Sequence, residues 1–146
     1  MPDVSVVIPV CNEDENVLPL AREIHAALAG RYSFEQIFVD DGSTDKTGEM
    51  VLAARAQGMP EIRLLQHVAR SGQSAAVATG VRHARGRWIA TLDGDGQNDP
   101  ADFPHLLDAL LQPASPGLKL VMGNRTTRRD TWLRRFSSRV ANGVRG

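Results

Sequence analysis

Short apolar runs alternate along this chain with longer segments whose apolar residues recur at a helical spacing. The runs are rich in β-branched residues and predict five strands, at 4–10, 37–39, 62–65, 88–92 and 118–122. Helices are predicted between them, starting after Glu13, at Asp45, at Ser74 and at Pro100. Stops for the first three are Gly30, Gly58 and Gly86, and Pro19 is compatible with the first helix only in its first turn. This alternation predicts an α/β fold, a mainly parallel sheet with helices on both faces.

Polar clusters follow three of the predicted strands. They are Asn12-Glu13, Asp40-Asp41-Gly42-Ser43 and the stretch from Asp93 to Gln97. Parallel strands end at one edge of a sheet, where ligands usually bind. A single acidic strand end is commonly only a solvated cap. Three that converge bring together carboxylates, which destabilise one another unless something neutralises them.

The last cluster carries the most specific chemistry. The apolar run 88–90 predicts a buried strand that delivers Asp93 and Asp95 to its end. Side chains two residues apart on a strand point to the same side, about 6 to 7 Å apart. A hard cation such as Mg²⁺ or Mn²⁺ would remove their repulsion and still bind waters and phosphate oxygens. Gln97 would add a carbonyl oxygen to this metal site.

Two other structures match part of the same stretch. An Asp-Gly pair between apolar flanks is common in hairpin turns. The motif also begins like a calcium loop, but Asn98 stands where that loop needs glycine and Pro104 where it needs glutamate. The calcium loop is therefore excluded. Asp99-Pro100 predicts that a helix starts directly after the acidic loop.

Composition bounds the size and the compartment. With 146 residues the chain has the size of one domain, and its single cysteine, Cys11, excludes an internal disulfide and fits a reducing compartment. We expect no signal peptide, because Asp3 comes at once, and no membrane span, because no run approaches ~18 apolar residues.

Charge is distributed unevenly although the net charge is zero. Residues 125–146 hold seven arginines and one acid, whereas the residues before them hold ten basic and sixteen acidic side chains. An arginine-rich end is by itself commonly a solvated tail. Nucleic-acid binding is disfavoured, because the body is acidic and this end offers only Trp132 and Phe136 for stacking.

Two common nucleotide-binding loops are missing from the sequence. The first strand leads into Pro9-Val10-Cys11-Asn12-Glu13 and not into G-x-G-x-x-G, and no G-x-x-x-x-G-K-[ST] occurs. A metal is therefore the natural route by which this chain would bind a diphosphate, while carboxylates after the second strand could accept hydrogen bonds from a base or ribose.

The motifs, taken in order, resemble those of family 2 glycosyltransferases with the GT-A fold. The matching stretches are Val6-Val7-Ile8-Pro9-Val10 with Asn12-Glu13, then Val39-Asp40-Asp41-Gly42-Ser43, then Gly72-Gln73-Ser74-Ala75-Ala76, then Asp93-Gly94-Asp95-Gly96-Gln97-Asn98-Asp99-Pro100. They are most similar to the group of dolichol-phosphate mannosyltransferases and polyprenyl-phosphate glycosyltransferases. The resemblance implies a GDP- or UDP-linked sugar donor, Mg²⁺ or Mn²⁺, a polyprenyl phosphate acceptor and inversion at the anomeric carbon.

The same resemblance assigns roles to individual residues. Donor-binding roles fall on Pro9, Glu13, Asp40, Asp41, Gly72 and Asp93, with Asp40 and Asp41 at the base. The metal would be held by Asp93, Asp95 and Gln97. Catalytic roles, including contacts to donor and acceptor phosphates, fall on Asp95, Arg125, Arg134 and Arg135. Residues 1–124 would be a nucleotide-sugar-binding core and 125–146 the start of an acceptor-facing part, on the cytoplasmic face of an anionic membrane.

Other functions stay open from the sequence. Members of this group continue well past position 146, so we expect the acceptor half to be incomplete and transfer to be poor. A non-catalytic nucleotide-sugar-binding fragment, or a metal-dependent nucleotidyltransferase, would use similar carboxylates. The four histidines, His25, His67, His83 and His105, are expected to be surface residues without carboxylate partners.

Overall fold

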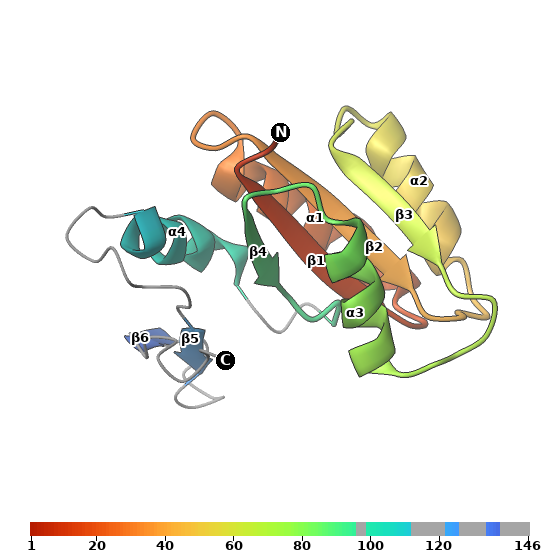
Figure 1. Ribbon diagram of the computed structural model, residues 1–146. Coiled ribbons are helices and arrows are strands. Elements are labelled where there is room, and N and C mark those ends of the chain that lie inside the picture. Colours follow the sequence, from red (N-terminus) through yellow and green to blue (C-terminus); the bar gives the residue numbers. More distant parts are fainter. Residues whose placement is uncertain (96–98, 112–121, 126–133, 138–146) are drawn as a thin grey trace. The chain divides into compact units, whose positions relative to one another are not determined.

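The computed structural model describes residues 1–95, 99–111, 122–125 and 134–137 (Figure 1). The chain groups into two compact units, Met1–Pro100 and Ala101–Gly146. The predicted division at residue 124 concerns which segment meets which substrate, and it stays a prediction.

The first unit is built on a parallel sheet of four strands in the order β3-β2-β1-β4. These strands are β1 (Val4–Val10), β2 (Phe34–Asp40), β3 (Ile62–Gln66) and β4 (Trp88–Thr91). The connections between them are the helices α1 (Asp14–Leu28), α2 (Thr47–Ala56) and α3 (Gln73–His83). Helices α1 and α2 cover one face of the sheet and α3 covers the other (Figure 1). The predicted α/β architecture is confirmed.

Burial explains why the central strands are continuous apolar runs. Every residue of β1 is buried, because its neighbours β2 and β4 flank it and helices cover both faces. On the α3 side, Val7 packs with Ile37, Val39 and Ala76 in one cluster. A Cβ atom at Gly80 of α3 would overlap the Val7 side chain, so the small residues of α3 let this helix lie directly on the sheet.

Two local predictions were wrong. Helix α1 begins at Asp14, which places Pro19 at the sixth helical position and not in the first turn. Pro19 is exposed, so its ring lies on the solvent side of α1, and it has no N–H to donate within the helix. Strand β4 was predicted to be buried, yet Ile89 is 43% exposed, because within the described residues β4 pairs only with β1 and lies at the sheet edge.

The described part of the second unit is small. The helix predicted from Pro100 is a 3₁₀ turn over Pro100–Asp102, which spans the boundary of the units, followed by α4 (Phe103–Leu111). Strand β5 (Met122–Arg125) pairs antiparallel with β6 (Arg134–Ser137) in a separate sheet. The strand predicted over 118–122 lies, except for Met122, outside the described residues. No helix among the residues the structure describes is long and apolar enough to cross a bilayer.

A buried carboxylate ties the amino-terminal ends of the strands together. Glu35 of β2 accepts a hydrogen bond from the Ser5 hydroxyl at 2.6 Å and another from the Arg85 main-chain N–H at 2.7 Å. Its second oxygen accepts from Arg63 of β3 at 2.7 Å. Burial alone would raise the pKa of Glu35, but the bonds from Ser5, Arg85 and Arg63 and the Arg63 charge hold that pKa below its ordinary value of 4.5.

We expect Glu35→Gln to destabilise the fold. Because the folded pKa of Glu35 lies below the unfolded one, its charge stabilises the fold above about pH 4.5 and this contribution is lost as pH falls through the folded pKa. The substitution should lower the free energy of unfolding near neutral pH by about 2 kcal/mol, measured by urea denaturation. In the variant, the free energy of unfolding should also fall less steeply as the pH drops below about 4.5. Glu23→Gln, an exposed position on α1, is the control and should leave both quantities unchanged.

Candidate functional site

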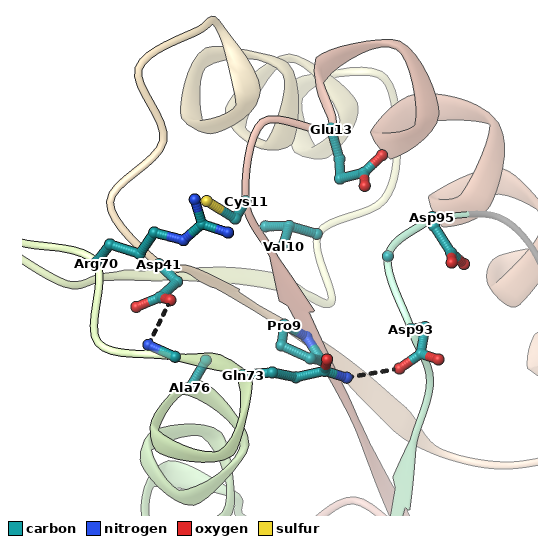
Figure 2. Close-up of a pocket in the computed structure, with 12 residues that line it drawn as sticks. Pro9, Val10, Cys11, Glu13, Asp41, Arg70, Gln73, Ala76, Asp93 and Asp95 are labelled. Carbon is teal, nitrogen blue, oxygen red and sulfur yellow. Dashed lines mark hydrogen bonds between the residues drawn. The ribbon is translucent and has the colours of Figure 1, made fainter.

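A cavity of about 230 Å³ opens at the carboxyl ends of β1, β2 and β4 (Figure 2). Its walls come from the end of β1, from the loops that follow the four strands, and from the first turn of α3. The lining residues are Pro9, Val10, Cys11, Glu13, Asp41, Arg70, Gly72, Gln73, Ala76, Asp93, Gly94 and Asp95. The structure thus brings the three polar strand ends into one site, as parallel topology requires.

Asn12 joins the loops that follow β1 and β2. Its side-chain oxygen accepts from the Thr44 N–H at 2.8 Å, and its own N–H donates to the Ser43 hydroxyl at 2.9 Å. Asn12 has a φ of 55°, a left-handed conformation that asparagine tolerates better than most residues. These bonds fix the two loops to each other beside the cavity.

The start of α2 is fixed to the start of α1 in the same way. The Thr47 hydroxyl accepts from the Glu13 N–H at 2.9 Å, and the Asp45 carboxylate accepts from the Thr47 N–H at 2.9 Å. Asp45 thus bonds the first residue of α2, but the helix begins at Thr47 and its N-cap residue is Lys46, so the prediction that Asp45 is the cap was one residue off. The Glu13 carboxylate lines the cavity and accepts from the Asn16 amide at 2.6 Å.

The neighbouring carboxylates Asp40 and Asp41 differ in whether they line the cavity. Asp40 accepts from the Ser43 N–H at 2.9 Å and from the Gln66 amide at 3.3 Å, and it is not among the residues that line the cavity. Asp41 lines the cavity and is only 4% exposed. The geometry therefore favours Asp41 over Asp40 as a ligand-facing group.

Three donors from one loop already hold the Asp41 carboxylate. They are the His67 ring nitrogen Nδ1 at 2.7 Å, the Ser71 N–H at 2.8 Å and the Gly72 N–H at 2.8 Å. Burial alone would raise the pKa of Asp41, but these bonds and the charge of His67 hold that pKa below its ordinary value of 3.8. Asp41 is thus an ionised acceptor, and of its roughly four lone-pair directions about one is left for a ligand.

The prediction that no histidine has a carboxylate partner was wrong for two of them. His67 contacts Asp41, and His25 contacts Glu61 at 2.7 Å. Each carboxylate lies on a different strand or loop from its histidine, so the linear sequence gave no sign of either pair. His67 also bonds through Nε2 to the Thr79 hydroxyl at 2.8 Å.

Asp93 and Asp95 follow β4 and both line the cavity (Figure 2). A Cβ atom at Gly94 between them would overlap Val10, so the turn lies directly against the end of β1. Asp93 accepts from the Gln73 amide at 2.9 Å and is exposed, as is Asp95. Gln97, the third predicted metal ligand, lies outside the described residues.

The donor chemistry of this turn suits a hard divalent cation. Two exposed carboxylates on one wall of a cavity offer oxygen ligands and leave other coordination positions for water and phosphate, the pattern typical of Mg²⁺ sites. Within the described residues, no group of three or more histidine, cysteine, aspartate or glutamate side chains could hold a metal ion. Asp93 and Asp95 would therefore hold a cation together with substrate oxygens.

Arg70 is a site residue that the sequence analysis missed, as is Gln73, which lines the same cavity and bonds Asp93. Arg70 is exposed, lines the cavity, and within the described part of the chain its side chain has no hydrogen-bond or ion-pair partner (Figure 2). It is the one basic side chain on a wall that otherwise carries Glu13, Asp41, Asp93 and Asp95. The sequence offered one sign of its role: Arg70 lies two residues before the motif that begins at Gly72.

The arginines with predicted catalytic roles belong to the second unit. Arg125 lies in β5 opposite Arg134 of β6, and Arg135 lies opposite Asn124. The ladder thus gathers three arginines in one two-stranded sheet. Their roles at phosphates stay predictions.

Comparisons with known proteins agree on one family. The family described as "Glycosyl transferase family 2" matches residues 5–143. The chain is 39% identical over 148 residues to the dodecaprenyl-phosphate galacturonate synthase of Rhizobium johnstonii, covering 99% of this chain and 42% of that protein. It is 37% identical over 143 residues to the undecaprenyl-phosphate 4-deoxy-4-formamido-L-arabinose transferase of Edwardsiella ictaluri, covering 97% of this chain and 42% of that protein.

A solved structure matches the fold and holds ligands. The mannosyltransferase of Pyrobaculum calidifontis in complex with GDP-Man and Mn²⁺ superposes with a TM-score of 0.73 and 25% identity, over 90% of this chain and 37% of that one. The chain spans about two fifths of the length of the curated relatives, as the 42% coverage shows. Because the family match extends over nearly the whole sequence, the chain belongs to the family 2 glycosyltransferases.

Proposed function

We propose that this chain is the nucleotide-sugar-binding part of a glycosyltransferase that moves a sugar from a UDP- or GDP-linked donor to a polyprenyl phosphate. The observation that carries this proposal is the single cavity in which Asp41, Asp93, Asp95 and Arg70 meet. The names of the two curated relatives, both polyprenyl-phosphate enzymes, support the acceptor class. The Mn²⁺ and GDP-Man in the similar structure support the donor class and a divalent metal.

The two sides of the cavity suit the two parts of such a donor. Asp41, together with Pro9, Glu13 and Gly72 of the same cavity, would bind the nucleoside, because a fixed carboxylate accepts from a base N–H or a ribose hydroxyl. Asp93 and Asp95 would face the diphosphate and hold Mg²⁺ or Mn²⁺ against it. Arg70 adds the positive charge and planar donor fork that phosphate oxygens prefer.

The reaction needs no strong base. A phosphate monoester carries more than one negative charge near neutral pH, so its oxygen attacks the anomeric carbon as an oxyanion. The bond from that carbon to the donor diphosphate breaks, nucleoside diphosphate leaves, and the configuration inverts. The difficulty is to bring two anions together, and Arg70, Arg125, Arg134 and Arg135 would offset that repulsion. A bound metal would stabilise the charge on the leaving diphosphate.

A second candidate is a nucleotide-sugar-binding chain that does not catalyse transfer. The specific observation in its favour is that every residue lining the cavity belongs to the unit Met1–Pro100. The nucleotidyltransferase alternative loses support because the family match points to glycosyl transfer.

Titration calorimetry with a panel of UDP- and GDP-linked sugars, in Mn²⁺, in Mg²⁺ and in EDTA, tests the proposed function. Metal-dependent binding, followed by release of nucleoside diphosphate on adding a polyprenyl phosphate, is the expected result. Binding without transfer would favour the second candidate. Pyrophosphate release from a nucleoside triphosphate would instead identify a nucleotidyltransferase.

We expect Asp95→Asn to uncouple donor binding from the metal. The substitution keeps the shape of the side chain and removes its charge, so a divalent cation would lose a strong ligand. Affinity for the nucleotide sugar, titrated against Mg²⁺ and Mn²⁺, should then no longer rise with metal concentration. An unchanged metal dependence would contradict the assignment of Asp95.

We expect Arg70→Gln to weaken UDP or GDP about 10- to 100-fold, since a charge-assisted hydrogen bond contributes about 1.5 to 3 kcal/mol. The loss should be similar for the nucleoside diphosphate and the nucleotide sugar, because both carry the phosphates. Arg82→Gln is the matched control, because Arg82 is an exposed arginine on α3 that does not line the cavity. Equal affinities of the two variants would remove Arg70 from the phosphate site.

We expect the arginine-rich end to bind anionic membrane, which would place the enzyme at the cytoplasmic face. Each basic residue near an anionic leaflet contributes about 1 kcal/mol, and salt screens this attraction. Co-sedimentation with vesicles rich in phosphatidylglycerol should fall with added salt and in Arg134→Ala with Arg135→Ala, while nucleotide affinity stays nearly constant. Binding that ignores both changes would refute membrane contact at this end.

A further inference from the structure

We propose that His67 is a positioning residue for the donor site and that it works as an imidazolium cation. The predicted effect on donor binding rests on the proposed function. The contact between His67 and Asp41 rests only on the geometry of the described residues. His67 does not line the cavity, so it acts through Asp41, which does.

The count of protons at the ring carries the charge assignment. Asp41 is ionised and only accepts, so the bond of 2.7 Å requires a proton on Nδ1 of His67. The Thr79 hydroxyl has one proton, and we assign it to the Ala75 carbonyl, which lies 3.0 Å away, one turn back in α3. Its oxygen is then an acceptor for Nε2 of His67 at 2.8 Å, so both ring nitrogens donate.

The ring links three elements at a nearly buried position. The His67 side chain is 16% exposed and that of Asp41 is 5% exposed. Through its ring, His67 connects the end of β2 to the middle of α3, and its main-chain N–H donates to the Asp40 carbonyl at 2.9 Å. Solvent therefore screens the charge pair little, and its orientation is fixed from both sides.

Asp41 passes this order on to the cavity wall. The carboxylate holds the consecutive N–H groups of Ser71 and Gly72, and Gly72 is the cap of α3 with a φ of 104°. Gln73 follows as the first residue of α3 and donates to Asp93 at 2.9 Å. The loop that carries Arg70 is thus fixed at His67, at Ser71 and at Gly72, between the two predicted halves of the donor site.

Among the described residues, few other titratable groups face this pair. On α3 the His83 ring bonds to the Thr79 carbonyl at 2.9 Å, beyond the hydroxyl that meets His67. On the strand side the Asp40 carboxylate faces Gln66 of β3. Arg70 is on the same loop as His67. A pH dependence that His67→Asn abolishes and His83→Asn leaves intact would therefore belong to the Asp41–His67 pair.

The proton on His67 makes the arrangement sensitive to pH. When the imidazolium loses its proton, the Thr79 hydroxyl must turn from Ala75 to Nε2, and the attraction to the Asp41 charge falls. The hold on Ser71 and Gly72 is therefore stronger with the imidazolium ring than with the neutral ring. Affinity for a nucleoside diphosphate should likewise be higher with the imidazolium ring.

The test combines a readout of the ring and loop with a readout of binding. Nitrogen-15 imidazole spectra of the free protein report the charge of His67, and hydrogen exchange reports the protection of the Ser71 and Gly72 amides. Calorimetry with UDP and with GDP in Mn²⁺, from about pH 5.5 to about pH 9, reports affinity. The variants are His67→Asn, which keeps a neutral donor near Nδ1, Thr79→Val, which removes the acceptor for Nε2, and the control His83→Asn.

We expect the spectra to show a doubly protonated His67 ring, and we expect affinity to be lower wherever the spectra show the neutral ring. His67→Asn should lose amide protection at Ser71 and Gly72, bind about tenfold more weakly at the acid end and bind independently of pH. Thr79→Val should move the pH dependence to lower pH, because Nε2–H loses its acceptor. His83→Asn should behave as wild type.

A neutral His67 ring throughout, or unchanged amide protection in His67→Asn, would overturn the inference. A wild-type protein that binds neither nucleotide would refute the proposed function, while the spectra and exchange would still decide the role of His67 in the loop. Binding by wild type and His67→Asn with the same affinity and the same pH profile would refute the link between the pair and the donor site.

Discussion

Repulsion between carboxylates is the constraint on which the arrangement of this site depends. Parallel strands deliver Glu13, Asp41, Asp93 and Asp95 to one cavity, and each added negative charge raises the cost of ionising the others. The fold offsets part of this cost with its own donors, from Asn16, the loop 67–72 and Gln73. The repulsion that these donors do not offset remains at the exposed carboxylates Asp93 and Asp95, where a cation has room to bind.

The fold supplies more hydrogen-bond donors to some of these carboxylates than to others, and this difference divides them into two groups. Asp41 is nearly buried and takes three donors from within the fold, so it organises a loop. Asp93 and Asp95 are exposed on a turn whose glycine lies against Val10. The first carboxylate is part of the scaffold of the site and the other two face what enters it.

Much of the fold could be predicted because its strands are buried on both faces. Strand β1 was predicted over the residues it occupies, since a two-sided burial leaves a continuous apolar run. The prediction was wrong for Pro19, because α1 begins at Asp14 and includes the proline beyond its first turn. It was also wrong for the burial of β4, because a position at the sheet edge is decided by the neighbouring strands and not by the local pattern. The acidic residues that follow the strands could be predicted to meet in one site, because parallel strands end at the same edge of a sheet.

The contacts across the sequence could not be predicted in this way. The partner of His67 lies 26 residues before it, and the crossover from β2 through α2 to β3 brings the two together. Arg70 likewise becomes a candidate site residue only because the fold places it in a cavity lined by acidic side chains. Single residues in loops carry no periodicity, so the sequence indicates that a loop is present and leaves its pairings open.

The Glu35 network and the cavity lie at opposite ends of the same strands, and this separation has an evolutionary consequence. Ser5, Glu35, Arg63 and Arg85 hold the amino-terminal ends, while every lining residue of the cavity comes from the carboxyl ends or from the loop and first turn of α3. Loops at the cavity can therefore diverge toward a different sugar or base while the clamp at the far end keeps the strands in register. A lineage built on this sheet is free to change what it binds without first gaining spare stability.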